Sequence, residues 1–313
     1  MIANPFISVV IPVYNEEESL QQLCSELFLV MESFSSWEII FIDDGSTDSS
    51  YSVLKKIVDD NSRVSAIRFF KNFGKADALS EGFKHTKGDI IITLDSDLQD
   101  DPVEIPNLVE KIQEDWDLVS GWKKSRQDPL SKRIPSRLFN FVTRLFTGIK
   151  IHDFNCGLKA YQRKVINAID IYGGLHRYIP AIAGQKGFSV TEIEVQHRPR
   201  EFGKTKYGGN RLFHGFFDLF TMLFTNKYFN RPLHFFGFIG LIIFMGGLII
   251  SIYLTVGWFQ GIYIGNRPIF FLGILLLIVG IQFFSIGLLG ELFIKNTAQS
   301  EKKVRSIYTT SQD

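Results

Sequence analysis

The stretch IIITLDSDLQDD, residues 90–101, decides the fold, because a continuous apolar run leads directly into a cluster of carboxylates. Residues 90–94 predict a short strand that is buried on both faces, as in a parallel sheet covered by helices. Asp95, Asp97 and Gln99 follow at the carboxyl end of that strand, where open α/β sheets bind their ligands. Mg²⁺ or Mn²⁺ often binds one or two carboxylates together with the oxygens of a diphosphate. The stretch therefore predicts a metal ion that holds a nucleoside diphosphate.

The pattern Asp-x-Asp is short, so an acidic surface turn stays open as an alternative for Asp95 and Asp97. A second copy, Asp115 and Asp117, precedes an apolar run. We expect this second copy to lie in a solvated loop. The rest of the chain has to show whether Asp95 and Asp97 form a ligand site or a surface turn.

Strands and helices alternate through the first part of the chain. Apolar runs predict strands at residues 7–13, 37–42, 64–70, 90–94 and 118–121. Helical spacing and capping residues predict helices at 16–31, at 76–85 and around 105–114. A further helix is predicted to open at the turn 43–48 and to end at residue 60. This alternation is typical of βαβ units, so the fold class is α/β with a mostly parallel sheet. Polar residues follow each of the first four strands, and one crevice at the carboxyl edge is expected to collect them.

Two common phosphate-binding motifs are missing from the sequence. The dinucleotide fingerprint Gly-x-Gly-x-x-Gly does not occur. Gly203, Lys204 and Thr205 resemble the end of a P-loop, but the position five before Gly203 is Arg198 rather than glycine. A metal ion therefore stays the expected means of holding a diphosphate.

Two uncharged runs near the C-terminus, Phe235–Trp258 and Pro268–Gly290, are each long enough to cross a bilayer as a helix. Basic residues flank the pair on both outer sides, whereas the loop 259–267 between them carries a single arginine. The positive-inside tendency predicts that both termini are cytoplasmic. No apolar signal segment precedes the first strand, and two cysteines fit a reducing compartment, so we expect the N-terminal domain to stay in the cytoplasm.

The segment Lys123–Lys150 holds eight basic residues against one acid, Asp128. Such a block is attracted to an anionic membrane surface. Within it, apolar residues repeat at helical spacing and predict an interfacial amphipathic helix. They are Leu138, Phe141, Val142, Leu145 and Phe146. A phenylalanine stripe within 213–224 repeats the pattern, and packing against the sheet stays open as the alternative for both. Nucleic acid is a poor candidate partner, because no base-stacking motif accompanies the charges.

Ordered sequence blocks resemble one known family. Four of them follow successive strands, namely IPVYNEEESL, IDDGSTD, NFGKADAL and TLDSDLQDDP, beginning at residues 11, 42, 72 and 93. They resemble the family 2 glycosyltransferases of GT-A fold, which have a Rossmann-like, mostly parallel sheet. HDFNCGLKAY at 152–161, HRPREFGKTKY at 197–207 and the two spans narrow the resemblance to polyprenyl-phosphate glycosyltransferases. These include dolichyl-phosphate mannose synthase and undecaprenyl-phosphate glucosyltransferases.

This resemblance implies transfer of one sugar, with inversion, from a nucleotide diphosphate sugar to a polyprenyl phosphate such as undecaprenyl phosphate. The enzyme would be an integral protein of the bacterial inner membrane that acts on the cytoplasmic face with Mg²⁺ or Mn²⁺. UDP-glucose is the favoured donor. GDP-mannose and modified UDP-sugars stay open, because Asp44 can meet either uracil or guanine.

The resemblance also implies site residues at matching positions. The residues expected to bind the nucleotide and the donor are Pro12, Tyr14, Glu16, Asp43, Asp44, Lys75 and Asp95. The residues expected to bind the metal ion are Asp95, Asp97 and Gln99. Asp153 matches an acidic residue near the sugar and the acceptor. Each of three residues also has an alternative role that stays open. Asp44 could be a helix N-cap, Lys75 could be merely exposed, and Asp153 could be a turn residue.

A phosphate monoester with a second pKa near 6 is mostly dianionic at pH 7, so it needs no strong base to act as a nucleophile. We hypothesise that Asp153 orients the acceptor or the sugar, with a role as base left open. Arg126, Arg200 and Lys206 would hold the lipid phosphate in line with the anomeric carbon. Further candidates for the acceptor phosphate are Lys123, Lys124, Arg137 and Arg198.

We expect a nucleotide-sugar-binding domain at 1–130 and an acceptor-side part at 131–230, followed by two transmembrane helices in 231–295 and a cytoplasmic tail at 296–313. Glycines in the first span could pack against partner subunits, so a homo-oligomer stays open. A processive polysaccharide synthase would need more spans and a Gln-x-x-Arg-Trp motif, and no tryptophan here follows an arginine. A non-catalytic scaffold or a flippase subunit is a further alternative. However, transport sites usually need charged residues within the membrane, and neither predicted span contains one.

Overall fold

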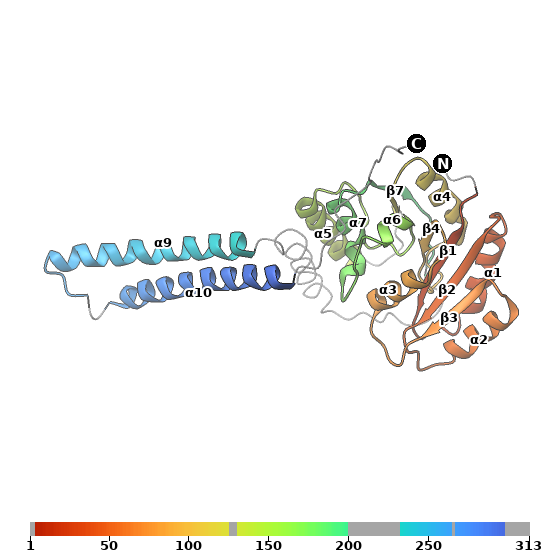
Figure 1. Ribbon diagram of the computed structural model, residues 1–313, viewed down its shortest axis with the longest axis horizontal. Coiled ribbons are helices and arrows are strands. Elements are labelled where there is room, and N and C mark those ends of the chain that lie inside the picture. Colours follow the sequence, from red (N-terminus) through yellow and green to blue (C-terminus); the bar gives the residue numbers. More distant parts are fainter. Residues whose placement is uncertain (1–3, 125–129, 200–231, 265–266, 298–313) are drawn as a thin grey trace, which may run out of the picture. The chain divides into compact units, whose positions relative to one another are not determined.

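The computed structural model describes residues 4–124, 130–199, 232–264 and 267–297. The chain divides into two compact units, residues 1–222 and 223–313. The first unit contains a seven-stranded sheet with helices packed against it (Figure 1). The second contains two long helices. Each unit is described separately.

The sheet of the first unit has the strand order β3-β2-β1-β4-β6-β5-β7. Its strands are β1 (Ile7–Val13), β2 (Trp37–Asp43), β3 (Val64–Arg68), β4 (Ile90–Thr93), β5 (Leu118–Trp122), β6 (Lys159–Gln162) and β7 (Val190–Glu194). Every pair is parallel except those of β6, which runs antiparallel to β4 and β5. The prediction of a mostly parallel sheet is confirmed. The chain beyond residue 130 completes this same sheet, because it supplies β6 and β7.

Helices follow the strands in the expected alternation. They are α1 (Leu20–Met31), α2 (Ser50–Asp60), α3 (Lys75–His85), η1 (Pro102–Glu104), α4 (Ile105–Gln113), α5 (Leu130–Thr147), α6 (Arg163–Ile166), η2 (Leu175–Tyr178) and α7 (Ile179–Gln185). Helix α1 begins at Leu20 rather than Glu16, because Asn15 has a φ of 50° and a turn closes from Ser19 N to Glu16 O at 3.2 Å. Its buried residues then recur at helical spacing and cover the sheet.

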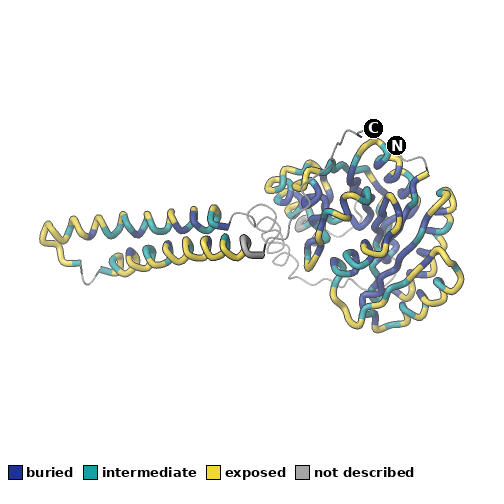
Figure 2. Tube along the Cα trace, in the orientation of Figure 1, coloured by how far each residue is buried: buried dark blue, intermediate teal, exposed yellow. Residues whose placement is uncertain are grey.

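The order of the strands reverses between β1 and β4, since β2 and β3 lie beyond β1 while β4 leads to the later strands. Ligands of open α/β sheets bind at such a switch point, outside the carboxyl ends of the strands. Both strands are buried almost throughout (Figure 2). The residues that follow β1 and β4 are therefore placed where a ligand is expected.

The second unit is a hairpin of α9 (Pro232–Phe259) and α10 (Pro268–Thr297), each long and apolar enough to span a membrane. Glycines let the two backbones approach: a Cβ on Gly240 would lie 2.7 Å from Gly280 O, and one on Gly247 would lie 2.8 Å from Leu277 N. Figure 2 shows many exposed residues along both helices of the hairpin, and the large hydrophobic side chains among them include Phe238, Ile249 and Leu289. These features make it a candidate transmembrane hairpin.

Candidate active site

The Asp95–Gln99 segment follows β4 in a tight turn that is tied to β1 and α1. Leu98 has a φ of 59°, and Gln99 N donates to Asp97 Oδ1 at 3.2 Å. Ser96 Oγ donates to Pro12 O at 3.1 Å, while Ser19 Oγ donates to Ser96 O at 2.7 Å. The turn is thus fixed against the carboxyl end of β1.

Lysine side chains neutralise the carboxylates of this turn. Lys75 Nζ, at the start of α3, pairs with Asp95 Oδ1. Lys123 Nζ, just after β5, lies 2.5 Å from Asp100 Oδ1, and both side chains are almost fully buried. A Cβ on Gly157 would lie 2.6 Å from Asp95 Oδ2 and 2.7 Å from Asp100 Oδ2. Glycine at this position therefore lets both carboxylates approach the backbone of residue 157.

Electrostatics keep the central groups of this cluster charged. Burial acts to raise the pKa of Asp95, but the ammonium groups of Lys75, Lys123 and Lys159 outweigh it and hold the pKa below its usual value. Burial acts to lower the pKa of Lys123, but Asp100 outweighs it and raises the pKa above its ordinary value. Asp95 and Lys123 are therefore ionised at neutral pH.

The donor set of the turn suits a divalent cation that is completed by a ligand. Asp95 and Asp97 supply two carboxylates at the predicted position. The described residues hold no group of three or more His, Cys, Asp or Glu side chains that could bind a metal ion. Mg²⁺ and Mn²⁺ commonly use one or two carboxylates and take their other ligands from phosphates and water. The carboxylates thus fit a cation that arrives with a diphosphate.

The acidic residues after β1 and β2 hold the loops around the switch point. Asp44 accepts from Phe73 N at 2.7 Å and from Gly74 N at 2.9 Å, so it orders the loop before Lys75. Asp44 does not cap α2, which begins at Ser50. Asp43 accepts from Ser46 N at 2.9 Å and is buried.

The other donor-side candidates lie at the same edge. Pro12 and Tyr14 are half-buried at and after the end of β1, and Glu16 is buried with its N–H donating to Ser50 Oγ at 2.9 Å. The structure thus brings together the residues predicted to bind the nucleotide. Their roles stay predictions.

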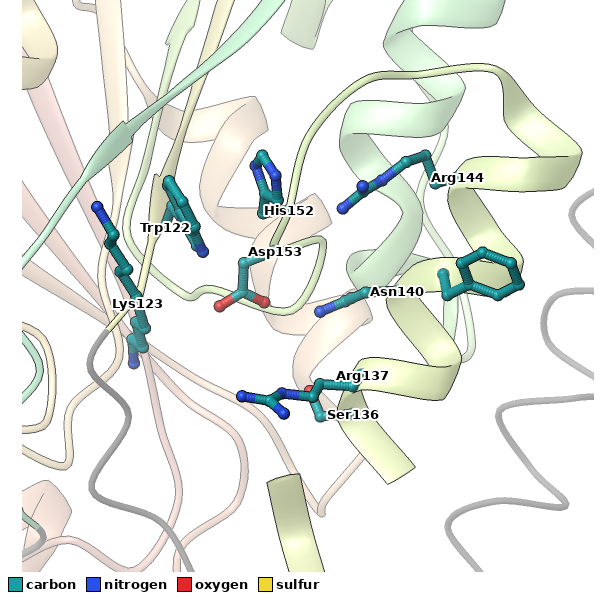
Figure 3. Close-up of a pocket in the computed structure, with 10 residues that line it drawn as sticks. Trp122, Lys123, Ser136, Arg137, Asn140, Arg144, His152 and Asp153 are labelled. Atoms are coloured by element: carbon teal, nitrogen blue, oxygen red, sulfur yellow. The ribbon is translucent and has the colours of Figure 1, made fainter. Parts of the chain in front are cut away.

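A cavity of about 370 Å³, here called the cationic pocket, lies between β5 and α5. Its lining consists of Trp122, Lys123, Lys124, Ser136, Arg137, Asn140, Phe141, Arg144, His152 and Asp153. The side chains of Arg137, Asn140 and Asp153 converge on it (Figure 3). Asp153 is only 2% exposed, and its Oδ1 accepts from Asn155 N at 3.0 Å, so the turn that it makes also fixes its carboxylate. A pocket with four Lys or Arg side chains and one buried carboxylate suits an anionic ligand.

Aromatic and acidic neighbours position the rim of the cationic pocket. The rings of Trp122 and His152 stack with centroids 4.2 Å apart. His152 Nδ1 bonds to Glu192, and Lys124 Nζ lies 2.5 Å from Glu194 Oε1. Both acidic partners come from β7, so this edge strand supports the pocket.

Arg198 lies elsewhere. Its guanidinium pairs with Glu26 at 2.6 Å and with Asp101 at 2.7 Å, which joins α1 to the start of η1. Its predicted role at the acceptor phosphate stays a prediction, although two carboxylates already compensate its charge. Arg126, Arg200 and Lys206 lie outside the described residues, as does the phenylalanine stripe within 213–224.

A second, smaller cavity of about 100 Å³, here called the sheet-edge cavity, lies beside Asp95. Its polar and charged lining includes Lys75, Asp95, Asn155, Lys159, His176 and Arg177. The segment 153–157 borders both cavities, since Asp153 lines the cationic pocket and Asn155 lines the sheet-edge cavity. One loop thus separates the cationic pocket from the cavity beside the carboxylate turn.

Several residues that line the two cavities were missed as candidates from the sequence, among them Lys159, His152, Trp122 and His176. Lys159 and His152 lie within the block HDFNCGLKAY, which was the available signal. Trp122 had no signal except its place beside Lys123. His176 belongs to η2, and no periodicity or motif marks it.

Comparison with known proteins identifies the family. The family model described as "Glycosyl transferase family 2" matches residues 8–170. The chain is 36% identical to a dodecaprenyl-phosphate galacturonate synthase of Rhizobium johnstonii, over 96% of this chain and 93% of the relative. It is 39% identical to an undecaprenyl-phosphate 4-deoxy-4-formamido-L-arabinose transferase of Salmonella choleraesuis, over 91% of this chain and 87% of the relative.

The fold also has counterparts among solved structures. A structure of glucosyl-3-phosphoglycerate synthase from Mycobacterium tuberculosis, in complex with Mn²⁺, UDP-glucose and phosphoglyceric acid, superimposes with a TM-score of 0.57 at 19% identity. The match covers 70% of this chain and 80% of that one. The chain therefore belongs to glycosyl transferase family 2, and it is a glycosyltransferase of the GT-A fold.

Proposed function

We propose that this enzyme transfers a single sugar from a nucleoside diphosphate sugar to a polyprenyl phosphate at a membrane surface, with inversion at the anomeric carbon. The observation that carries the proposal is the cationic pocket around Asp153, which shares the segment 153–157 with the cavity beside Asp95. Such an arrangement offers one place for an anionic nucleophile and a neighbouring place for the sugar. The relatives named above act on dodecaprenyl or undecaprenyl phosphate, which supports the same acceptor class here.

On the donor side, Asp95 and Asp97, with Gln99 beside them, would hold Mg²⁺ or Mn²⁺ together with the diphosphate. A divalent cation held there would neutralise the charge that develops on the departing nucleoside diphosphate. Pro12, Tyr14, Glu16, Asp43 and Asp44 would bind the nucleoside. Lys75 lies in an ion pair with Asp95 and would meet a phosphate or the sugar.

On the acceptor side, the lipid phosphate would lie in the cationic pocket against Lys123, Lys124 and Arg137. Arg126, Arg200 and Lys206 are proposed to complete its binding. Because the phosphate is already dianionic at neutral pH, Asp153 is proposed to orient it or the sugar rather than to remove a proton. Asp153→Asn should then lower kcat without an activity recovery at higher pH, whereas a recovery would favour a base.

The membrane side of the proposal has two supports. Four large apolar side chains of α5 are exposed, namely Leu138, Phe141, Leu145 and Phe146. The hairpin of α9 and α10 is long and apolar enough to anchor the enzyme in the bilayer. We propose that the GT-A unit and both termini are cytoplasmic in a bacterial inner membrane, with the loop between the helices on the opposite side.

The test uses the full-length protein in vesicles with undecaprenyl phosphate and a panel of labelled donors: UDP-glucose, GDP-mannose, UDP-hexuronates and a UDP-aminopentose. We expect one donor to give a labelled lipid, and EDTA should abolish the labelling until Mg²⁺ or Mn²⁺ is restored. Asp97→Asn should lower the rate by at least 100-fold, because one carboxylate ligand is lost. The exposed Asp59→Asn is the matched control and should leave the rate unchanged. Vesicles that never yield a labelled lipid with any donor would instead support a non-catalytic scaffold.

A further inference from the structure

We infer that the sheet-edge cavity selects a donor sugar that carries a carboxylate, a hexuronate, with Lys159 as the residue that determines this specificity. The inference rests on the proposed function, because it concerns the donor of that transfer. It departs from UDP-glucose, the donor favoured by the resemblance in sequence.

The first observation is the unbalanced charge of the cavity. Two lysine side chains line it, Lys75 and Lys159, against the single carboxylate of Asp95. Lys75 is already paired with that carboxylate. A neutral hexose would leave the excess positive charge in place, whereas an anionic substituent would neutralise part of it.

The second observation is that Lys159 is buried without a carboxylate paired to it in the described part of the chain. Its side chain is buried, with only 4% of the residue exposed, and Nζ donates to the backbone carbonyl of Cys156. In the described part of the chain no carboxylate forms an ion pair with it, and Asp95 and Asp153 act on it only from a greater distance. A buried ammonium group without a paired anion is costly, and an anionic group of a ligand would offset that cost.

The third observation is a hydrogen-bonding atom left over in the same cavity. His176 lines the cavity from η2, and its Nδ1 is buried with no hydrogen-bond partner among the described residues. Buried polar atoms of native proteins nearly always have a partner. A sugar hydroxyl or carboxylate that entered the cavity would provide one.

Depth and size decide which part of the donor reaches this place. In the sheet, Lys159 of β6 is opposite Thr93 of β4, two residues before Asp95. It therefore lies deeper in the fold than the carboxylates that face the diphosphate. The cavity of about 100 Å³ is also well below the roughly 300–1,000 Å³ that whole ligands need, so it suits one end of a sugar ring.

The experiment compares matched donors on the full-length enzyme in vesicles with undecaprenyl phosphate. UDP-glucuronate is paired with UDP-glucose, and UDP-galacturonate with UDP-galactose, so that each pair differs only in a carboxylate against a primary alcohol. We expect kcat/KM to be at least 100-fold higher for one uronate than for its neutral partner. Lys159→Met should reduce this preference at least 30-fold, because kcat/KM should fall much further for the uronate than for its neutral partner. The exposed Lys186→Met is the control and should keep the wild-type preference.

Dissociation constants of the same donors and of UDP, measured by calorimetry, make the inference independent of turnover. Uronate-selective binding that Lys159→Met removes supports the inference even if no donor is transferred, in which case only the proposed transfer fails. A wild-type preference for the neutral sugars overturns the inference and leaves the proposed function intact. An equal loss of affinity for UDP and every donor in Lys159→Met also overturns it, because Lys159 would then hold the diphosphate.

Discussion

Asp117 is a buried carboxylate whose bonds join three elements. Its Oδ1 lies 2.5 Å from Lys164 Nζ of α6, and its Oδ2 accepts from Ser189 N, before β7, at 2.8 Å. Burial acts to raise the pKa of Asp117, but these bonds outweigh it and hold the pKa below its usual value. We expect Asp117→Asn to lower the free energy of unfolding by about 1–2 kcal/mol at pH 7. Trp116 is adjacent, so tryptophan fluorescence during chemical unfolding of the full chain measures the change.

The pH dependence of this difference has a definite sign. Because the pKa of Asp117 is lower in the folded than in the unfolded chain, its ionisation stabilises the fold above about pH 4. The stabilisation is lost as the pH falls through the folded-state pKa. The gap between Asp117→Asn and wild type should therefore narrow below pH 4, whereas the exposed Asp59→Asn should stay within about 0.5 kcal/mol of wild type throughout. A gap that does not change with pH would show that charge plays no part.

The sequence predicts side chains well where their neighbours along the chain determine them. Asp95 and Asp97 follow the predicted strand because a buried apolar run is a local signal. The expectation that Asp117 is solvated was wrong, because its partners Lys164 and Ser189 are distant in the chain. His176 and Lys159 could not be placed beside Asp95 for the same reason, since only the packing of η2 and β6 brings them there.

At the scale of elements, helix α5 presents apolar side chains to solvent rather than to the sheet. Leu138 is 57% exposed and Leu145 is 68% exposed, which contradicts the alternative of core packing for these residues. Neither lines the cationic pocket, so they can be changed without altering it. We expect Leu138→Ser with Leu145→Ser to lower kcat/KM for undecaprenyl phosphate in vesicles at least tenfold, because burying one such side chain in lipid contributes about 1.5–3 kcal/mol.

A short, water-soluble prenyl phosphate separates membrane docking from damage to the pocket. With this acceptor the double variant should retain wild-type activity within about twofold. Leu29→Ser on α1, where the leucine is 75% exposed, is the matched control and should leave both acceptors unaffected. Equal losses with both acceptors would count against a membrane role for α5.

Elements differ in how far the sequence predicts them. The five early strands and the helices between them have strong periodic signals, and their ends shift by only a few residues. Strand β6 carries almost no signal, because it is four residues long and begins with Lys159. Its antiparallel place between β4 and β5 is a tertiary effect, and this place brings Lys159 to the sheet-edge cavity.

At the scale of the whole molecule, the proposed reaction depends on which side of the membrane the GT-A unit occupies. A charged nucleotide sugar does not cross a bilayer unaided, so the unit has to face the compartment that contains the donor. The two native cysteines, Cys24 and Cys156, are buried and give a low labelling background. In intact bacterial cells, a membrane-impermeant thiol reagent should label Gln260→Cys, in the exposed turn after α9, at least tenfold more than Lys56→Cys on α2. Permeabilised cells should show both sites labelled, and the reverse pattern in intact cells would place the carboxylate turn away from its donor.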